Sequence, residues 1–113
     1  MALEDSTVHQ MLNALTVTHV SLHSVVAPAG GASELTGHDY GRLPMTLAAA
    51  AARKRLLSAD AVFNLGPGHA PKAIGFWNNA AFLGHSTLSL QPTIVVDDAT
   101  YTCPAATTGL QIP

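Results

Sequence analysis

Short runs in which apolar and polar residues alternate recur along the whole chain, and this period-two pattern constrains the fold more than any other feature. In the first run, residues 16–24, Val20 and Leu22 share one face while His19 and Ser21 share the other. The later runs are 42–49, 57–65, 72–77, 81–90, 93–96, 100–103 and 107–112. Alternation of this kind is typical of half-buried strands. Runs at intervals of about 8–12 residues predict a mainly β domain, a β-sandwich or jelly-roll of seven to eight short antiparallel strands.

Three segments depart from the strand pattern. Residues 5–15 carry apolar side chains at helical spacing and predict a short N-terminal helix. Its apolar stripe is Val8, Met11, Leu12 and Leu15, and its candidate N-caps are Asp5 and Ser6. Residues 25–41 are rich in glycine and predict a long loop, whereas the alanine-rich and basic segment 48–57 fits either a helix or a turn followed by a strand. We expect the 113 residues to form a single domain, 1–113.

Charged residues make up only 11% of the chain, less than half of the usual share of about 25%. The formal net charge is −2, so the chain lacks the basic field that would hold nucleic acid or an anionic membrane. The longest apolar run, residues 47–52, is too short to span a bilayer. A single cysteine excludes an internal disulfide framework and a Cys-rich zinc site. The first residues lack the regions of a signal peptide, so we expect synthesis in a cytosol.

So few charges leave much of the surface to small neutral residues. The cores of protein interfaces are depleted in Lys, Glu and Asp, so this composition favours a chain that is covered by neighbours in an assembly. A neutral β-rich domain that is charge-poor for other reasons is the alternative.

Six histidines invite a metal site, but their spacing does not support one. His19 and His23 on a strand would lie roughly 13 Å apart, too far to share a zinc ion, and we expect outward-facing histidines instead. His85 and Ser86 are neighbours on a strand and would point to opposite faces, so they do not form a nucleophile–base pair. We expect Cys103 to be a buried filler. The sequence therefore predicts no catalytic, cofactor-binding or metal residue.

Two features are suited to protein contacts. The basic triplet Arg53-Lys54-Arg55 favours a solvated turn or a salt-bridge contact to a neighbouring subunit, because three charges bind phosphate only weakly. Trp77 lies on the opposite face from Ile74 and Phe76 of the same run. It fits an exposed interface anchor and a core that uses both faces of the strand equally well.

The order of motifs is informative as well. A strand ending in Val20-Ser21-Leu22-His23 precedes a loop with Glu34-Leu35-Thr36-Gly37, followed by Tyr40 and Arg42. The segments 59–64, 73–78 and 82–88 come next. This order, over roughly residues 5–112, resembles a family of small virion proteins of tailed bacteriophages, described as tail-fibre or minor structural proteins. The chain departs from the family in 25–30, where the family often has an Asp-Pro turn.

The resemblance implies a β-sandwich structural module without enzyme activity or cofactor. We therefore expect a non-enzymatic structural protein of a tailed-phage particle, which decorates or stabilises the capsid or forms part of the tail or tail fibre through self-association. The expected partners are other copies of the chain, with a trimer as one arrangement, and the major capsid or tail proteins, but no nucleic acid and no membrane. The expected location is the virion, assembled in the host cytoplasm.

The expected docking elements are the N-terminal helix and the loop around 27–41. The residues expected at the interface are Glu34, Leu35, Tyr40, Arg42, Arg53, Lys54, Arg55 and Trp77. A glycan- or receptor-binding adhesion module on the virion surface is the alternative function, and its sugar site would draw on Tyr40, Trp77 and Tyr101.

Overall fold

The computed structural model describes residues 3–92 and 94–111, which form a mainly β fold with one N-terminal helix. The helices are α1 (Asp5–Asn13) and the short 3-10 helix η1 (Ala29–Gly31). The strands are β1 (His19–His23), β2 (Leu43–Pro44), β3 (Lys54–Leu56), β4 (Ala61–Leu65), β5 (Ala73–Asn78), β6 (Ala81–Thr87), β7 (Ala99–Cys103) and β8 (Gly109–Gln111). The predicted fold class, a small β-sandwich of short antiparallel strands after one helix, is confirmed.

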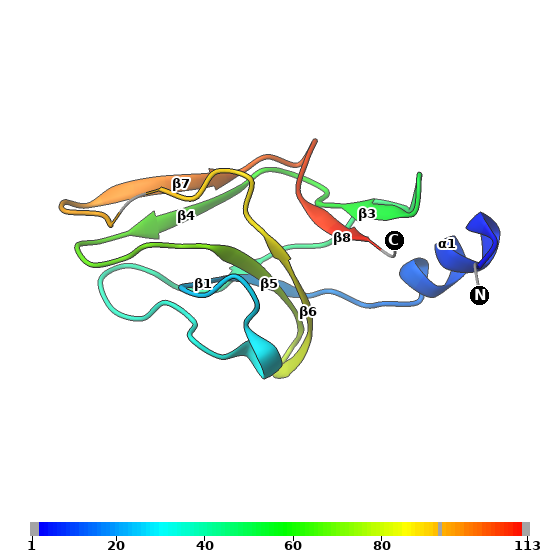
Figure 1. The fold of residues 1–113 in the computed structure, drawn as a ribbon, viewed down its shortest axis with the longest axis horizontal. Helices are drawn as coiled ribbons and strands as arrows, with labels where there is room; N and C mark the ends of the chain where they lie inside the picture. The colour runs from blue at the N-terminus through cyan, green and yellow to red at the C-terminus, as the bar shows by residue number, and fades with distance from the viewer. Residues whose placement is uncertain (1–2, 93, 112–113) are drawn as a thin grey trace.

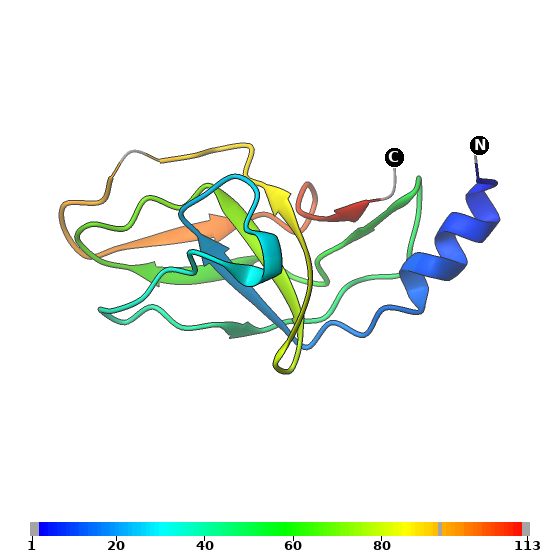
Figure 2. The ribbon, with the colours of Figure 1, turned by 60° about the horizontal axis from the view of Figure 1, so that its bottom comes forward.

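All the strand pairs of the described residues are antiparallel, and they form one large and two small sheets (Figures 1 and 2). The large sheet has the order β2-β1-β5-β6, while β3 pairs with β8 and β4 pairs with β7. The pairs β3–β8, β4–β7 and β5–β6 are nested. The last six strands therefore follow the path of one long hairpin folded over on itself, an arrangement that suits a jelly roll.

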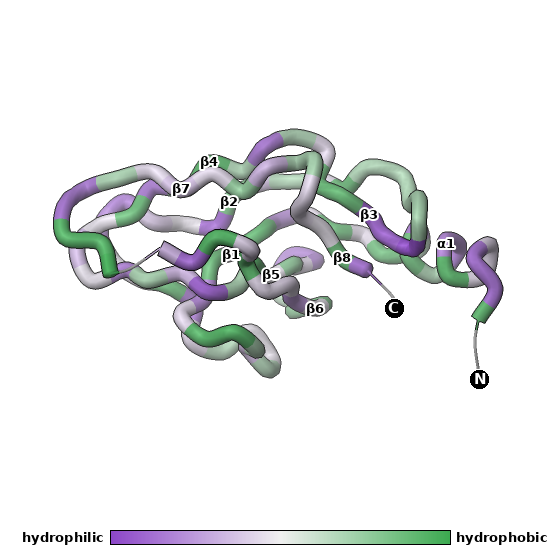
Figure 3. The backbone as a smooth tube through the Cα atoms, turned by 45° about the horizontal axis from the view of Figure 1, so that its top comes forward, coloured by the Kyte–Doolittle hydropathy of each residue, from purple (hydrophilic) through white to green (hydrophobic). Residues whose placement is uncertain are grey.

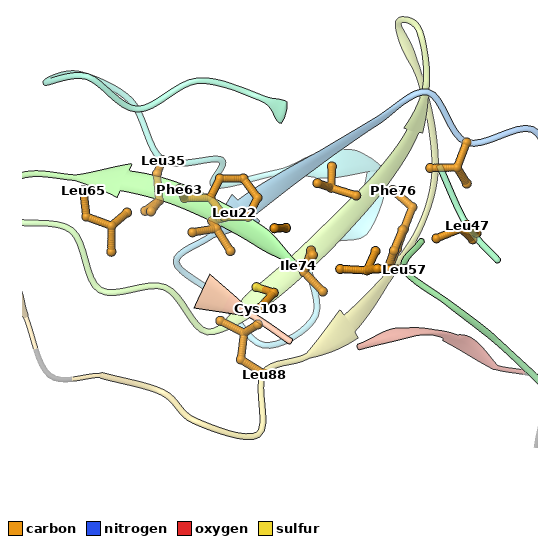
Figure 4. Close-up of a cluster of buried hydrophobic side chains, with 13 residues drawn as sticks. Leu22, Leu35, Leu47, Leu57, Phe63, Leu65, Ile74, Phe76, Leu88 and Cys103 are labelled. Carbon is orange, nitrogen blue, oxygen red and sulfur yellow. The ribbon is translucent and has the colours of Figure 1, made fainter. Parts of the chain in front are cut away.

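The hydrophobic core lies between the large sheet and the β4–β7 pair (Figure 4). Along β4 the side chains of Ala61, Phe63 and Leu65 are buried, while Val62 and Asn64 are exposed, because successive side chains of a strand point to opposite faces. The large sheet supplies the opposing side chains Val20, Leu22, Ile74 and Phe76, and Cys103 of β7 lies beside the β4 side chains. The alternation along β4 is therefore the pattern that the sequence predicts.

β1 and β5 lie in the middle of the large sheet and are buried on both faces. This corrects the expectation that the first strand is half-buried. Ser21 and His23 are fully buried, so the expectation of an outward-facing histidine is wrong for His23. Trp77 is only 7% exposed, so of its two alternatives the core that uses both faces is the observed one. The loop 25–41 covers this second face, which a strand-by-strand pattern does not anticipate.

α1 lies at one end of an elongated molecule whose principal extents are 46 × 25 × 25 Å (Figure 2). Val8 and Leu12 of the predicted stripe are buried, as a short helix that depends on docking requires. The helix is shorter than predicted, and neither Asp5 nor Ser6 is its N-cap. Glu4 occupies that position, and its side chain makes no capping hydrogen bond.

The segment 48–57 contains a turn followed by a strand, which is one of its two predicted alternatives. Ala51 and Lys54 form an isolated bridge, and the two residues between them have positive φ values, 50° at Ala52 and 62° at Arg53. A helix cannot contain two consecutive residues in this conformation.

Three other boundaries differ from the predictions. In the run 42–49 the only strand is β2, followed by the single hydrogen bond from the Met45 N–H to the Thr18 carbonyl oxygen and an isolated bridge at Leu47. The described part of 93–96, residues 94–96, is not a strand. The turn between β5 and β6 consists of Asn79 and Ala80, since Asn78 pairs with Ala81, and Asn79 has the positive φ of 53° that a tight hairpin needs. Within the described ranges, no helix is long and apolar enough to cross a membrane.

Candidate functional site

The loop signature and the tryptophan of β5 form one cluster, which we call the clasp: Glu34, Tyr40, Arg42 and Trp77. Arg42 Nη2 lies 2.8 Å from Glu34 Oε1, and Arg42 Nε lies 3.0 Å from Glu34 Oε2, so the ion pair is bidentate. The Arg42 guanidinium lies over the Trp77 ring, 3.6 Å from its centroid. Tyr40 Oη donates to Glu34 Oε2 at 3.1 Å. The sequence signature therefore binds the loop to the sheet within the chain.

The electrostatics of the clasp stabilise the charged arginine and the neutral tyrosine. The hydrogen bonds and the charge of Glu34 raise the pKa of Arg42. Burial raises the pKa of Tyr40, so its phenol remains a hydrogen-bond donor. The Tyr40 oxygen also accepts the Leu22 N–H at 2.8 Å. Strand β2 pairs only with His19 and Val20 of β1 and does not reach Leu22. The Tyr40 hydroxyl therefore accepts the Leu22 N–H in place of a backbone carbonyl of a longer neighbouring strand.

A buried chain of hydrogen bonds continues beneath the clasp. Trp77 Nε1 donates to Ser21 Oγ at 2.7 Å, and Ser21 Oγ lies 2.6 Å from His23 Nε2. His23 Nδ1 lies 2.8 Å from the carbonyl oxygen of Ala32, which can only accept, so Nδ1 carries a proton. The Ser21 hydroxyl is then free to donate to Nε2. A proton on Nε2 as well would leave the Ser21 proton without this acceptor, so the neutral ring protonated at Nδ1 is the form that fits both contacts. The ring joins β1 to the loop 25–41.

Ser21 and His23 have the geometry of a nucleophile and its base, but both side chains are fully buried. Burial lowers the pKa of His23. The ring of Phe82 lies edge-on to both His23 and Trp77, with centroid distances of 5.8 Å and 5.0 Å. With no exposed atom on the pair, a substrate cannot reach it in this conformation.

Two glycines make the close packing of this region possible. A Cβ on Gly75 would lie 2.5 Å from His23 Nε2 and 2.7 Å from Ser21 Oγ. A Cβ on Gly31 would lie 2.7 Å from the Trp77 ring, and Gly31 also has a φ of 81° that disfavours other residues. The hydrogen-bonded chain therefore depends on the absence of side chains at both positions.

A second buried histidine also holds the loop 25–41. His69 Nε2 lies 2.7 Å from the Thr36 carbonyl oxygen, and its Nδ1 accepts the Gly66 N–H at 3.0 Å. His69 is 5% exposed, which again corrects the expectation of outward-facing histidines. His38, at the tip of the loop, lies 3.0 Å through Nε2 from the Pro67 carbonyl oxygen. Three histidine rings thus connect the loop to the body of the molecule.

The basic triplet lies elsewhere and fastens α1. Arg55 Nη1 donates to the carbonyl oxygens of Leu12 and Leu15, 3.1 Å and 2.5 Å away, at the C-terminal end of α1 and just beyond it. The Leu12 oxygen also accepts the Leu15 N–H at 3.2 Å. Arg53 Nη1 donates to Asp5 Oδ1 at 2.8 Å. Both arginines therefore make contacts within the chain, and the expected contact to a neighbouring subunit stays a prediction.

The structure divides the eight residues expected at the interface. Glu34, Tyr40, Arg42 and Trp77 come together in the clasp, and Arg53 and Arg55 come together beside α1. Leu35 belongs to the hydrophobic core and is 7% exposed, so it and Trp77 are unsuited to a surface contact. Lys54 is exposed between the two arginines.

Other chemistry has little support in the described residues. None of their His, Cys, Asp and Glu side chains form a group of three or more that could hold a metal ion. Cys103 is buried, as predicted, and burial raises its pKa to about 12. A cavity of about 120 Å³ lies between β6 and β7, with Ser86, Thr102 and Thr108 in its lining. Pockets for cofactors are usually at least about 300 Å³, so this one suits water or a very small molecule.

Sequence reasoning missed the buried network because it treated the second face of β1 as solvent-facing. The alternation itself held the relevant signal, since it places Ser21 and His23 on one face of the strand. What it did not contain was the loop that covers this face. No family model, curated protein or solved structure matches the chain.

Proposed function

We propose that the chain is a non-enzymatic structural protein of a tailed-phage particle, which decorates or stabilises the capsid or forms part of the tail or tail fibre. It acts by packing against copies of itself and against other proteins of the particle. The observation that carries this proposal is a group of exposed apolar side chains, Leu90, Ile94 and Val96, in an uncharged segment between β6 and β7.

This segment, residues 86–96, begins with the last two residues of β6 and leads toward β7. It contains no charged residue, and Asp97 and Asp98 follow it directly. The side chains of Leu90, Ile94 and Val96 are 71%, 62% and 75% exposed. Figure 3 shows the hydrophobic stretch after residue 93 at the far end from α1. Single exposed apolar residues are normal, but a concentration of them marks a contact surface. A protein partner would remove this apolar surface from water without desolvating any formal charge of the segment.

Several of the chain's charged side chains are engaged in contacts within it. Glu34 pairs with Arg42, Asp5 pairs with Arg53, and Arg55 binds backbone carbonyls. Charges that are already paired do not need a partner subunit to compensate them. This arrangement supports association through neutral surfaces, because the desolvation of charges is the main penalty when polar faces are brought together.

Size-exclusion chromatography with light scattering tests self-association through this segment. We expect the wild-type chain to form oligomers and the double variant Ile94→Lys, Val96→Lys to shift toward the monomer. The control is Thr100→Lys, which adds a charge at an exposed position of β7 and should leave the oligomer intact. A wild-type chain that stays monomeric, and that also fails to bind phage heads or tails, contradicts the proposal.

The glycan-binding alternative has less support. Trp77 lies beneath Arg42, Tyr40 Oη is bonded to Glu34, and Tyr101 Oη donates to the Leu90 carbonyl oxygen at 2.5 Å. A sugar site needs exposed aromatic faces beside free polar groups, and these three side chains already have partners within the chain.

A further inference from the structure

The loop 25–41 is fastened to the sheet through a histidine whose two ring nitrogens have opposite roles. We propose that His23 is the proton-sensitive element of a latch, so that binding of a second proton by its ring releases the loop 25–41 from β1 and β5. The molecule would then have two conformations. In the closed one the loop 25–41 is packed on β1 and β5, and in the open one the loop is released and the contacts of the clasp are broken.

The hydrogen-bonded chain explains why a second proton is incompatible with the closed loop. In the neutral ring, Nε2 accepts the Ser21 hydroxyl proton while Nδ1 donates to the Ala32 carbonyl oxygen. In the cation both nitrogens donate, so the Nε2 proton points at Ser21 Oγ, which already accepts the Trp77 N–H. The Ser21 proton then loses its acceptor in a fully buried position. A buried polar group without a partner is strongly unfavourable, and so is a buried charge.

The close packing around His23 also prevents the ring from moving to another acceptor and prevents water from reaching it. Gly75 lies against the His23 ring so closely that a single added carbon would be 2.5 Å from Nε2. The ring of Phe82 closes another side, 5.8 Å from the imidazole centroid. The ring therefore cannot gain water without displacement of the loop.

The charges around His23 act in both directions. Glu34, which forms an isolated backbone β-bridge with His23, favours the charged form of the His23 ring, whereas Arg42 and His85 disfavour it. Arg42 is bound to the same Glu34 carboxylate and offsets its charge at this site. Burial is the largest influence and lowers the pKa of His23 below its ordinary value of 6.5.

The sign of the pH dependence follows from the difference between the pKa of His23 in the closed loop and in the open loop. His23 in the open loop titrates near its ordinary value of about 6.5, and the closed loop binds this proton only at lower pH. Between these two pKa values the open state binds more protons than the closed state, so the closed state loses stability as the pH falls. The equilibrium constant for opening should rise by up to about tenfold for each pH unit below about 6.5, until the pKa of the closed state is reached.

The wild-type protein offers a direct test. The Leu35 amide, which donates to the Leu22 carbonyl oxygen at 3.0 Å, reports closure of the loop. Its hydrogen-exchange protection factor, measured from about pH 7.5 to about pH 4.5, should fall below pH 6.5 while amides of the β4–β7 pair keep theirs. Nitrogen chemical shifts of the ring should show His23 protonated at Nδ1 at neutral pH. A ring protonated at Nε2, or a Leu35 protection factor that does not change with pH, would overturn the proposal.

Histidine variants identify the responsible ring. His23→Gln keeps an oxygen that can accept the Ser21 proton but cannot titrate, so the Leu35 protection factor should lose its pH dependence. His85→Gln removes an exposed histidine and should retain the dependence. His69→Gln removes the other buried histidine, whose ring faces His38 and Tyr40, and should also retain it. A dependence that disappears with His69 and persists without His23 would overturn the assignment. If His23→Gln does not fold, the wild-type measurements decide.

Discussion

Arg42 makes two kinds of contact with one guanidinium, a bidentate pair with Glu34 and a stack over Trp77. Its side chain is 35% exposed, so solvent screens the ion pair and the stack contributes the larger share. We expect Arg42→Ala to lower the free energy of unfolding by about 1–2 kcal/mol. Arg42→Lys should restore only part of this, because an ammonium group neither stacks nor binds a carboxylate bidentately.

Denaturant unfolding followed by the fluorescence of Trp77, the single tryptophan, measures this effect. Lys54→Ala, at an exposed position outside the clasp, is the control and should unfold like the wild type. An Arg42→Ala variant with the wild-type midpoint and emission would show that the clasp contributes nothing to closure of the loop.

Gly75 tests the packing beneath the clasp at the scale of one carbon atom. We expect Gly75→Ala to lower the free energy of unfolding by about 1–3 kcal/mol, because its Cβ would overlap His23 and Ser21. The matched control is Gly84→Ala on the adjacent strand, where the nearest atom to the new Cβ is Leu110 Cδ2 at 3.5 Å. The control should stay within about 0.5 kcal/mol of the wild type, and equal effects of the two substitutions in calorimetry would argue against the packing described.

At the residue scale, the sequence was a good guide to which residues gather and a poor guide to why. The sequence places four residues at an interface between subunits: Glu34, Tyr40, Arg42 and Trp77. In the structure Glu34 bonds to Tyr40 and Arg42, and Arg42 lies over the Trp77 ring, all within one chain. The sequence contains the same charged loop residue and the same tryptophan in a strand whether their contacts are within one chain or between two chains. Only the path of the loop 25–41 decides between the two.

α1 illustrates how an element too short to be stable alone is held in place. Arg55 binds two carbonyl oxygens at its C-terminal end, and the Arg53 backbone N–H donates to His9 Nε2 at 3.0 Å. We expect Arg55→Ala to reduce the helical signal in far-UV circular dichroism and to destabilise the protein by about 1–3 kcal/mol, because both carbonyl oxygens lose their charged donor and the Leu12 oxygen keeps only the Leu15 N–H among the bonds described. Lys54→Ala should keep the full signal. Retention of the helix in Arg55→Ala would mean that Val8 and Leu12 suffice to dock it.

Elements with a strong local pattern were predicted within a few residues. β4 has strict alternation, and residues 5–13 have helical spacing together with a docking stripe, so both were recognisable. Residues 48–57 were ambiguous because alanine favours a helix, while the positive φ values at Ala52 and Arg53 arise from the turn that leads into β3. Backbone pairing with a distant strand, here β8, overrode local propensity.

At the scale of the whole molecule, Cys103 reports on the integrity of the core. Its thiol is 1% exposed, and burial raises its pKa to about 12, so little reactive thiolate is available in the folded state. We expect a disulfide reagent to label native Cys103 at least about a thousandfold more slowly than the unfolded chain. A cysteine at the exposed neighbouring position, Thr102→Cys with Cys103→Ala, should label rapidly. Fast labelling of native Cys103 would contradict the closed core.

The fold class was accessible from sequence because it depends on the spacing of turns and on the period-two pattern. The division into one large and two small sheets was not, because pairs such as β3 with β8 join segments far apart in the chain. The burial of β1 and β5 on both faces was equally out of reach, since it depends on a loop with no periodicity of its own.

Under the proposed function the chain belongs to a tailed-phage particle, and imaging of intact particles is the decisive test. We expect density for this fold in the particle, repeated according to the particle's symmetry, with the segment 86–96 in contact with another subunit. Particles that contain no copy of the chain, or copies whose segment 86–96 faces solvent throughout, would contradict it.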